Sequence, residues 1–225
     1  MNIALILAAG SSKRTNTDIP KQFVLINNKP ILLYSFLTFN EVEEIEHIYI
    51  VTSEEYMTYV DELLKDYPKY NGVILGGKTR QESVSNALDI LEAKYDENTT
   101  ILIHDSARAN VSKSIILRNI EASKKYPAIT TAIDVSDTIS LSKDKETIES
   151  YLNRDELKII QTPQTFNLKL LFEAYQKAKL DNITATDDTK IIKHFNEKVH
   201  YVEGSSLNFK ITKKEDLEIF LKLTK

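Results

Sequence analysis

Leu5-Ile6-Leu7-Ala8-Ala9-Gly10-Ser11-Ser12-Lys13-Arg14, with Pro20-Lys21-Gln22 shortly after it, is the stretch of this chain that decides the fold. An apolar strand runs straight into a loop of small residues, and the loop carries an arginine and, seven positions later, a lysine. Small side chains allow backbone N–H groups to approach an anion, and the two cations can neutralise its charge. The stretch matches neither the P-loop nor the dinucleotide-binding glycine pattern. It indicates a polyphosphate-binding loop, with a nucleotide as the expected ligand, although a tight turn with unrelated surface cations has the same local pattern.

The composition sets the class of protein. The 225 residues are enough for one α/β domain with its own core, and 42% hydrophobic and 28% charged residues are ordinary for a soluble chain. A formal net charge of −4 argues against a general nucleic-acid binder, which needs a basic face. The lack of cysteine excludes disulfides and thiolate metal sites, and no apolar run approaches the length of a membrane span. With no signal-peptide pattern at the N-terminus, we expect a cytoplasmic protein without nucleic-acid or membrane partners.

Strand and helix patterns alternate along the chain. Apolar strands are expected at residues 3–7, 47–51, 73–75, 100–103, 128–133 and 199–202. Helical patterns are expected at residues 31–39, 56–67, 79–91, 113–126 and 168–179, and from Thr186 and Thr212 onward. Strands that are apolar on both faces, with helices between them, predict a Rossmann-like, mostly parallel sheet with helices on both faces.

Candidate functional residues follow three of the expected strands. They lie at residues 10–14, 76–80 and 105–108. Because ligands of such sheets bind beyond the carboxyl ends of the strands, these segments are expected to meet at one site. Unrelated surface charges would have no reason to gather at one edge.

Residues 137–161 break the alternation. Thr138 is followed by alternating Ile139 and Leu141, a charged tip, and a second apolar stretch at residues 148–152. This pattern predicts a β-hairpin arm that leaves the main sheet. Such arms commonly exchange contacts with a second subunit, so we expect a homodimer, with a solvent-exposed hairpin that has no partner as the alternative. We treat residues 1–225 as a single domain that carries this arm.

A series of short motifs spans the whole chain. They are Leu7-Ala8-Ala9-Gly10 with Arg14, Pro20-Lys21-Gln22-Phe23, Gly76-Gly77-x-x-Arg80-x-x-Ser83-Val84, His104-Asp105-x-x-Arg108, Asp137-Thr138-Ile139, Asn153-Arg154, Gln161-Thr162-Pro163-Gln164-x-Phe166, Thr186-Asp187-Asp188, and Gly204 with Asn208-x-Lys210-x-Thr212-x-x-x-Asp216-Leu217. In this order and spacing they resemble the sugar-phosphate and polyol-phosphate cytidylyltransferases. The closest resemblance is to the family of 2-C-methyl-D-erythritol 4-phosphate cytidylyltransferase and ribitol-5-phosphate cytidylyltransferase.

The resemblance implies an activity and a set of site residues. The reaction is the transfer of CMP from CTP to the phosphate of a small polyol phosphate, with release of pyrophosphate and with Mg²⁺ or another divalent cation as cofactor. The implied catalytic residues are Arg14, Lys21 and Lys210. The implied nucleotide-binding residues are Ala8, Ala9, Gly10, Gly77, Arg80 and Ser83. The implied acceptor-binding residues are Asp105, Arg108, Thr138, Arg154, Thr162 and Thr186. Asp105 is also expected near the metal, and Thr138 and Arg154 are expected to reach the partner subunit's site.

Several of these roles have plainer structural alternatives. Asp105 could cap a turn, Lys210 could be a solvated lysine, and Thr186 could cap a helix. Arg154 could be a surface charge of the arm. His104 is expected to be a strand-end residue held by the backbone rather than a catalytic base or metal ligand.

Two departures from the family pattern bear on the acceptor and the loop. Ser12 stands where the family usually has a second glycine, and serine adopts positive φ less readily. Ala109-Asn110 follows Arg108 where the family usually has proline, so this loop leaves the acceptor open.

We expect 2-C-methyl-D-erythritol 4-phosphate as the acceptor, for isoprenoid precursor synthesis, because Thr186-Asp187-Asp188 is typical of that branch. Ribitol 5-phosphate, for teichoic acid or capsule, is the alternative, since Asn153-Arg154 and residues 20–23 also match the ribitol branch. Two further alternatives are a UTP- or ATP-dependent nucleotidyltransferase and a non-catalytic nucleotide-binding module. The block at residues 76–80 argues against the first, and the retention of all the expected catalytic cations argues against the second.

Overall fold

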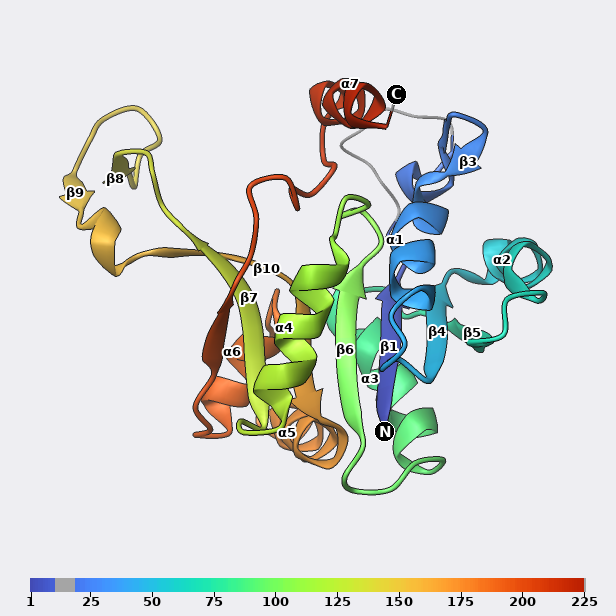
Figure 1. The fold of residues 1–225 in the computed structure, drawn as a ribbon. Coiled ribbons are helices and arrows are strands. Elements are labelled where there is room, and N and C mark those ends of the chain that lie inside the picture. The colour runs from blue at the N-terminus through green and yellow to red at the C-terminus, as the bar shows by residue number, and fades with distance from the viewer. Residues whose placement is uncertain (11–18, 225) are drawn as a thin grey trace.

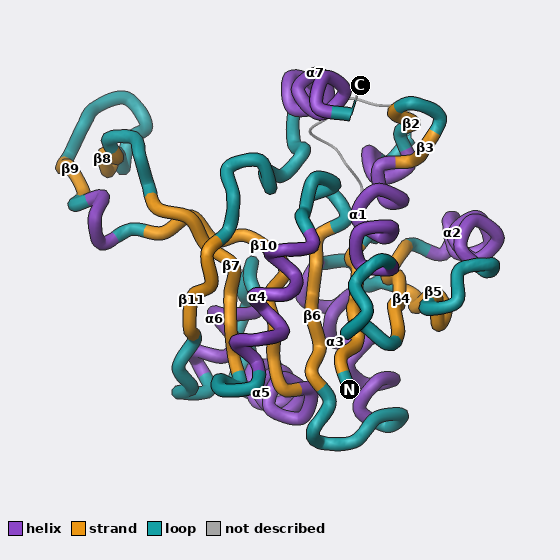
Figure 2. Tube along the Cα trace, viewed as in Figure 1, coloured by secondary structure: helices purple, strands orange, loops and turns teal. Residues whose placement is uncertain are grey.

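A central sheet organises the protein (Figures 1 and 2). The computed structural model describes residues 1–10 and 19–224, and within them the main sheet has seven strands in the order β11-β7-β10-β6-β1-β4-β5. These strands are β1 (Asn2–Leu7), β4 (His47–Thr52), β5 (Tyr70–Leu75), β6 (Thr100–Asp105), β7 (Ala128–Asp134), β10 (Lys158–Asn167) and β11 (His200–Glu203). Each expected strand is present, so the prediction of an α/β fold is confirmed.

The sheet is mostly parallel, as expected. β1 pairs in parallel with β4 and β6, β4 with β5, and β7 with β11, whereas β10 runs antiparallel to both β6 and β7. The sequence pattern does not predict β10, because Gln161, Thr162, Gln164 and Thr165 are polar although the sheet buries them. The register of β10 against β7 shifts between Gln161 and Gln164, on either side of Pro163, which has no N–H to donate to a ladder.

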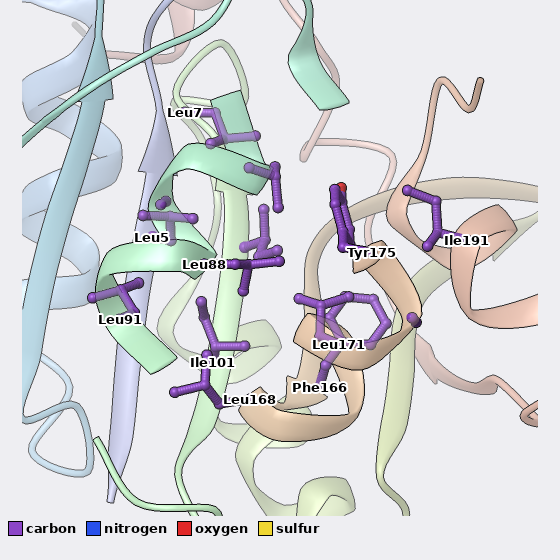
Figure 3. Packing of buried hydrophobic residues seen from close by; sticks show 14 of the residues in the cluster. Leu5, Leu7, Leu88, Leu91, Ile101, Phe166, Leu168, Leu171, Tyr175 and Ile191 are labelled. Carbon is purple, nitrogen blue, oxygen red and sulfur yellow. The ribbon is translucent and has the colours of Figure 1, made fainter. Parts of the chain in front are cut away.

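Helices cover both faces of the sheet, which confirms the expected layering. On one face α3 (Arg80–Glu92), α5 (Leu168–Leu180) and α6 (Asp188–His194) pack with Leu5 and Leu7 of β1 (Figure 3). On the other face α1 (Ile31–Asn40), α2 (Met57–Leu64) and α4 (Lys113–Ser123) pack with Ala4 and Ile6. Because successive strand side chains point to opposite faces, an unbroken apolar strand is buried between two helix layers. No helix within the described residues combines the length and the apolar character needed to cross a membrane.

A capping box sets the start of α3. The backbone N–H of Glu82 donates to Thr79 Oγ1 at 3.0 Å, and the backbone N–H of Thr79 donates to Glu82 Oε2 at 3.2 Å. The expected helix at residues 79–91 is therefore confirmed. The capping box places Arg80 at the first turn of the helix, three residues after Gly77.

Two other helices begin two residues later than expected, at Asp188 and Lys214 rather than at Thr186 and Thr212. Asp187, rather than Thr186, caps α6 and accepts the N–H of Thr189 at 2.8 Å. At α7 (Lys214–Leu223), the carboxylate of Asp216 accepts the N–H groups of residues 212 and 213, at 2.7 and 2.8 Å.

The predicted arm is present as a hairpin. β8 (Ile139–Leu141) pairs antiparallel with β9 (Ser150–Leu152), and the hairpin projects well away from the main sheet (Figure 1). Its apolar residues Ile148, Tyr151 and Leu152 are 57%, 67% and 42% exposed in the single chain. A second, smaller hairpin is formed by β2 (Leu25–Ile26) and β3 (Lys29–Pro30). Its turn contacts the C-terminal end of the chain, where Asn27 donates to Thr224 O.

Candidate functional site

The carboxyl edge of the main sheet, at the top in Figure 1, brings distant segments together. Backbone hydrogen bonds hold the segments after the central strands in place: Ala8 N–H to Val51 O at 2.7 Å, Gly76 N–H to Thr52 O at 2.7 Å, and Ser106 N–H to Leu7 O at 3.0 Å. The start of the small-residue loop, the glycine pair and the Asp105 loop are thus fixed side by side. This is the edge at which parallel α/β sheets bind ligands.

Gln22 ties the start of the small-residue loop to the segment that carries Lys21. Its buried side-chain amide donates to Ala8 O at 2.7 Å and to Gly10 O at 2.9 Å. Lys21 and Gln22 belong to the short 3₁₀ helix η1 (Lys21–Phe23), so Lys21 directly precedes the residue that contacts Ala8 and Gly10. Arg14 lies outside the described residues.

The glycine pair allows very close packing. A Cβ on Gly76 would lie 2.6 Å from Ala9 Cβ, and a Cβ on Gly77 would lie 2.3 Å from Glu82 Cβ. The hydroxyl of Ser83 accepts the N–H of Gly77 at 3.0 Å and donates to the carbonyl of residue 79 at 2.9 Å. The structure therefore brings the expected nucleotide-binding residues Ala9, Gly77 and Ser83 together, with the Ser83 hydroxyl holding the loop.

Arg80 occupies the centre of a charge cluster. Its two terminal nitrogens donate to the carboxylate of Asp188 at 2.9 and 2.7 Å, and its Nε donates to Asp105 Oδ1 at 3.2 Å. Burial disfavours the charged guanidinium, but Asp188 and Asp105 outweigh burial and raise the pKa of Arg80 above its usual value. The contacts that the structure gives Arg80 are these carboxylates, and its contact with a nucleotide remains a prediction.

Asp105 links Arg80 to Lys210. The ammonium of Lys210 donates to Asp105 Oδ2 at 2.6 Å, so each carboxylate oxygen of Asp105 faces a different cation. Burial opposes the charge of Asp105, but Arg80 and then Lys210 hold the pKa of Asp105 well below its usual range. Asp105 is therefore ionised at neutral pH and holds the ammonium of Lys210 at this edge, while the catalytic role of Lys210 stays a prediction.

His104 and Thr162 hold the Asp105 loop from behind. The two ring nitrogens of His104 lie 3.1 Å from Thr162 Oγ1 and 3.2 Å from Arg108 O. Because the carbonyl of Arg108 can only accept, Nε2 carries the proton and Nδ1 accepts from Thr162. Thr162 Oγ1 also accepts the N–H of Asp105 at 3.1 Å. Burial lowers the pKa of His104 to about 4, so the ring is neutral at neutral pH, and its predicted structural role is supported.

Arg108 reaches across the same loop. Its terminal nitrogens donate to Asn208 O at 2.8 Å and to Ile160 O at 3.3 Å, while its buried Nε has no hydrogen-bond partner among the described residues. Burial lowers the pKa of Arg108 from its usual value, although a guanidinium stays protonated at neutral pH. A buried, charged donor without a partner is suited to an anionic ligand.

Three predicted acceptor residues lie apart from this cluster in the single chain. Thr138 and Arg154 are exposed on the arm, where Arg154 donates to Ser136 O at 2.9 Å. Thr186 is exposed just before α6. Their predicted roles therefore depend on a bound ligand or on a second subunit.

Sequence reasoning missed the residues that hold Arg80 and the start of α6. Asp188 is fully buried, and besides Arg80 it accepts from the hydroxyl of Tyr175 at 2.5 Å. Gln164 is also fully buried and donates to Asp187 at 2.6 Å. The Asp187-Asp188 pair was visible in the motif, but as a helix start. The presence of an acidic pair in one motif and an arginine in another could have suggested the contact between Asp188 and Arg80.

The cluster could bind a metal ion only if a bound ligand supplied most of the coordinating oxygens. Within the described residues no three His, Asp or Glu side chains are grouped as metal ligands. Asp105 is ionised and lies at the edge, but both of its oxygens already accept from cations. It can contribute one ligand to an Mg²⁺ whose remaining ligands are phosphate oxygens and water, which is a common arrangement for this ion.

Comparisons with known proteins agree with this geometry. The chain matches the family model IspD, described as 2-C-methyl-D-erythritol 4-phosphate cytidylyltransferase, over residues 2–221. Proteins of that name from Clostridium botulinum and Thermosipho melanesiensis are 38% and 40% identical, over 99% and 96% of this chain and 99% and 95% of the relatives. The crystal structure of 4-diphosphocytidyl-2C-methyl-D-erythritol synthase from Anaerococcus prevotii is 29% identical with a TM-score of 0.85, covering 99% of this chain and 97% of that chain. The chain therefore belongs to the 2-C-methyl-D-erythritol 4-phosphate cytidylyltransferase family and is a nucleotidyltransferase.

Proposed function

We propose that this protein transfers CMP from CTP to 2-C-methyl-D-erythritol 4-phosphate and releases pyrophosphate, a step of isoprenoid precursor synthesis. One observation carries the proposal: the chain of contacts from Lys210 through Asp105 to Arg80, at the edge where the small-residue loop begins. Lys210 and Asp105 are 105 positions apart in the sequence. Their meeting at a ligand-binding edge supports a shared phosphate site.

The reaction is a displacement at phosphorus. An oxygen of the acceptor phosphate attacks the α-phosphorus of CTP, a new P–O bond forms, and the bond to the bridging oxygen of the β-phosphate breaks. Pyrophosphate leaves with that oxygen. The protein has little covalent chemistry to perform, so positioning and charge neutralisation dominate the rate. In this proposal Arg14, Lys21 and Lys210 neutralise the charge around the α-phosphate, and Asp105 holds Lys210 in place.

The base and the triphosphate are assigned to the small-residue segments. Ala8, Ala9 and Gly10 at the end of β1, together with Gly77 and Ser83, leave room for backbone groups to contact cytosine directly. The Cβ distances at the glycine pair support this, because side chains there would displace the loop. A close-fitting site of this kind favours a pyrimidine over a larger purine.

A divalent cation fits beside Asp105 with the triphosphate, as its ionised carboxylate indicates. When bound, Mg²⁺ would supply further neutralisation of phosphate charge. Asp105 would hold the ion and Lys210 at once.

In this proposal the acceptor binds near Arg108, in the loop that follows Asp105. The unpartnered Nε of Arg108 supports a role in binding the acceptor phosphate, and Thr162 and Thr186 would contact the polyol. Thr162 can offer only a lone pair, because its proton is directed to His104. Pyrophosphate release should be measured with CTP and each acceptor in turn. Faster turnover with ribitol 5-phosphate than with methylerythritol phosphate would overturn this choice.

Lys21 provides the test of the reaction itself. Lys21→Ala should lose nearly all turnover while the thermal midpoint stays within a few degrees, because the removed ammonium acts on the reacting phosphate. Lys124→Ala is the matched control and should retain full activity, because Lys124 is 67% exposed and lies at the C-terminal end of α4. An unchanged kcat for Lys21→Ala would refute the role of Lys21. Competition among the four nucleoside triphosphates would identify a UTP- or ATP-dependent enzyme.

We further propose that the arm joins two copies of the chain and brings Thr138 and Arg154 to the partner subunit's site. The exposed apolar side chains of Ile148, Tyr151 and Leu152 support this, since a pairing of arms would bury them. Tyr151→Lys should shift the sedimentation coefficient toward a monomer. Leu180→Lys, at a leucine that is 81% exposed on α5, is the control. A wild-type monomer at micromolar concentration would refute the dimer.

A further inference from the structure

A small apolar cluster lies apart from the two main cores. Its buried members are Ile26, Ile31, Ala109, Ile211 and Phe220, with Val24, Tyr34, Phe209, Leu217 and Leu221 packed against it. We call this set the satellite core. Among the described residues, the two main cores contain no side chain from α7. The satellite core is therefore what docks α7 on the rest of the protein.

Three segments of the satellite core lie next to segments of the phosphate site in the sequence. Ala109 follows Arg108, and Ile211 follows Lys210 in the sequence. The N–H of Ile211 donates to Ala107 O at 2.8 Å, which joins the Lys210 and Arg108 segments by their backbones. The N–H of Val24 donates to Lys21 O at 3.1 Å, and the N–H of Ile31 donates to Val24 O at 3.1 Å. The chain segments that carry three cations of the proposed site thus all lead into one apolar cluster.

Phe220 is the central side chain of this cluster. It is fully buried, and its ring meets the ring of Tyr34 edge-on, with centroids 5.0 Å apart at 83°. The hydroxyl of Tyr34 donates to Ile26 O at 2.7 Å. Phe220 therefore connects α7 both to α1 and to the β2–β3 hairpin that follows Lys21.

Polar contacts hold α7 at both ends. At its start, Asp216 accepts the N–H and the hydroxyl of Thr212, at 2.7 and 2.9 Å, two residues after Lys210. At its end, the side-chain amide of Asn27 donates to Thr224 O at 3.0 Å. α7 thus spans from the Lys210 segment to the turn of the small hairpin, as its position at the top of Figure 2 shows.

We propose that α7, through Phe220, is a positioning element that sets the placement of Lys210 relative to Lys21 across the triphosphate. The inference rests on the proposed function, which assigns both lysines to the same phosphates. The packing transmits position because an apolar core filled by one large ring holds its surrounding segments at fixed spacing. A displacement of about 1 Å at reacting groups can cost on the order of 100-fold in rate.

The test compares two buried phenylalanines. Phe220→Leu should lower kcat and weaken CTP binding, measured by calorimetry, by roughly tenfold each, because the cations no longer converge. Phe36→Leu is the matched control. Phe36 is fully buried in a main core, with its ring 5.1 Å from that of Tyr67, and belongs to no site segment. The Phe36→Leu variant should lose a similar amount of stability. Assayed well below its melting temperature, it should stay within about twofold of wild type in both kcat and CTP binding.

Equal values for the two variants, per folded molecule, would overturn the positioning role. If Phe220→Leu does not fold, Asn27→Gly replaces it, since Asn27 has φ 46° and glycine accepts positive φ. Weaker CTP binding in that variant supports the proposal, and unchanged binding overturns it. The proposed function fails separately, by absence of turnover in the wild type, and CTP binding still reports on α7 in that case.

Discussion

Replacing Asp188 by asparagine would isolate the contact that holds Arg80. Asp188 is fully buried and accepts two hydrogen bonds from Arg80 and one from the hydroxyl of Tyr175. Asparagine has nearly the same shape, so the packing is kept while the charge is lost. One acceptor oxygen also becomes an N–H₂ group that faces a donor.

The expected cost follows from burial. Removing one partner of a buried ion pair costs about 3–5 kcal/mol, because the other charge is left without compensation. Arg80 is 24% exposed and keeps its contact with Asp105, so we place Asp188→Asn at the lower end of that range. Arg80→Gln leaves Asp188 fully buried without its cation and should cost at least as much. The double variant pairs two neutral amides. Its loss of unfolding free energy should be smaller than the sum of the two single losses by about 1.5–3 kcal/mol.

The measurement is urea unfolding of the wild type, both single variants and the double variant, followed by circular dichroism. Glu121 and Lys124, which are 74% and 67% exposed, form a matched surface pair whose coupling should stay under about 1 kcal/mol. If the free energies of the Arg80 and Asp188 variants add within about 0.5 kcal/mol, the two side chains are not coupled. That result would refute the view that Asp188 holds Arg80.

Three further outcomes follow from the site. Gly77→Ala should lower kcat/KM for CTP by about tenfold or more, as assayed by pyrophosphate release, because the new Cβ would lie 2.3 Å from Glu82 Cβ and would displace the loop. Lys210→Ala should lower kcat by roughly 100-fold or more under the same assay, and a loss confined to KM would contradict its role at the reacting phosphate. Because burial lowers the pKa of His104 to about 4, the unfolded chain binds its proton between pH 6.5 and 4 while the folded chain does not. That stability, about 3 kcal/mol, is fully present above pH 6.5 and is lost as the pH falls toward 4. His104→Asn should flatten this part of the unfolding free energy measured against pH.

The layered sheet was predictable because its signal is local. The consecutive apolar residues 3–7 of β1 and 48–51 of β4 can be buried only between two layers, and capping residues such as Thr79 mark where helices begin. β10 carries no such signal, since it places Gln161, Thr162 and Gln164 inside the sheet. Those side chains are tolerated there because they have hydrogen-bond partners: Asn208 donates to Gln161, and Gln164 donates to the half-buried Asp187. Which distant partner satisfies a buried amide is not written in any short window of sequence.

The same reason limits what could be predicted of the site. Position along the strands predicts that the segments beginning at Gly10, Gly76 and Asp105 meet, because carboxyl ends of parallel strands share an edge. The pairing of Arg80 with Asp188 joins residues 108 positions apart and depends on how α6 packs against α3 and α5. Lys210 was recognisable only through the resemblance to a family. Its contact with Asp105 depends on the path of the chain after β11.

The structure also separates two kinds of residue that the motifs combine. Ser83 directs its hydroxyl to the loop backbone, Thr162 to His104, and Arg80 to carboxylates, so each uses its polar atoms largely within the protein. Lys210 and Arg108 differ: Lys210 is 38% exposed beside Asp105, and Arg108 keeps a buried donor without a partner among the described residues. Preorganised groups accelerate phosphoryl transfer only if something holds them before the substrate binds. In the proposed mechanism such a motif carries both the groups that act on the phosphates and the groups that hold them, and sequence spacing alone does not distinguish the two.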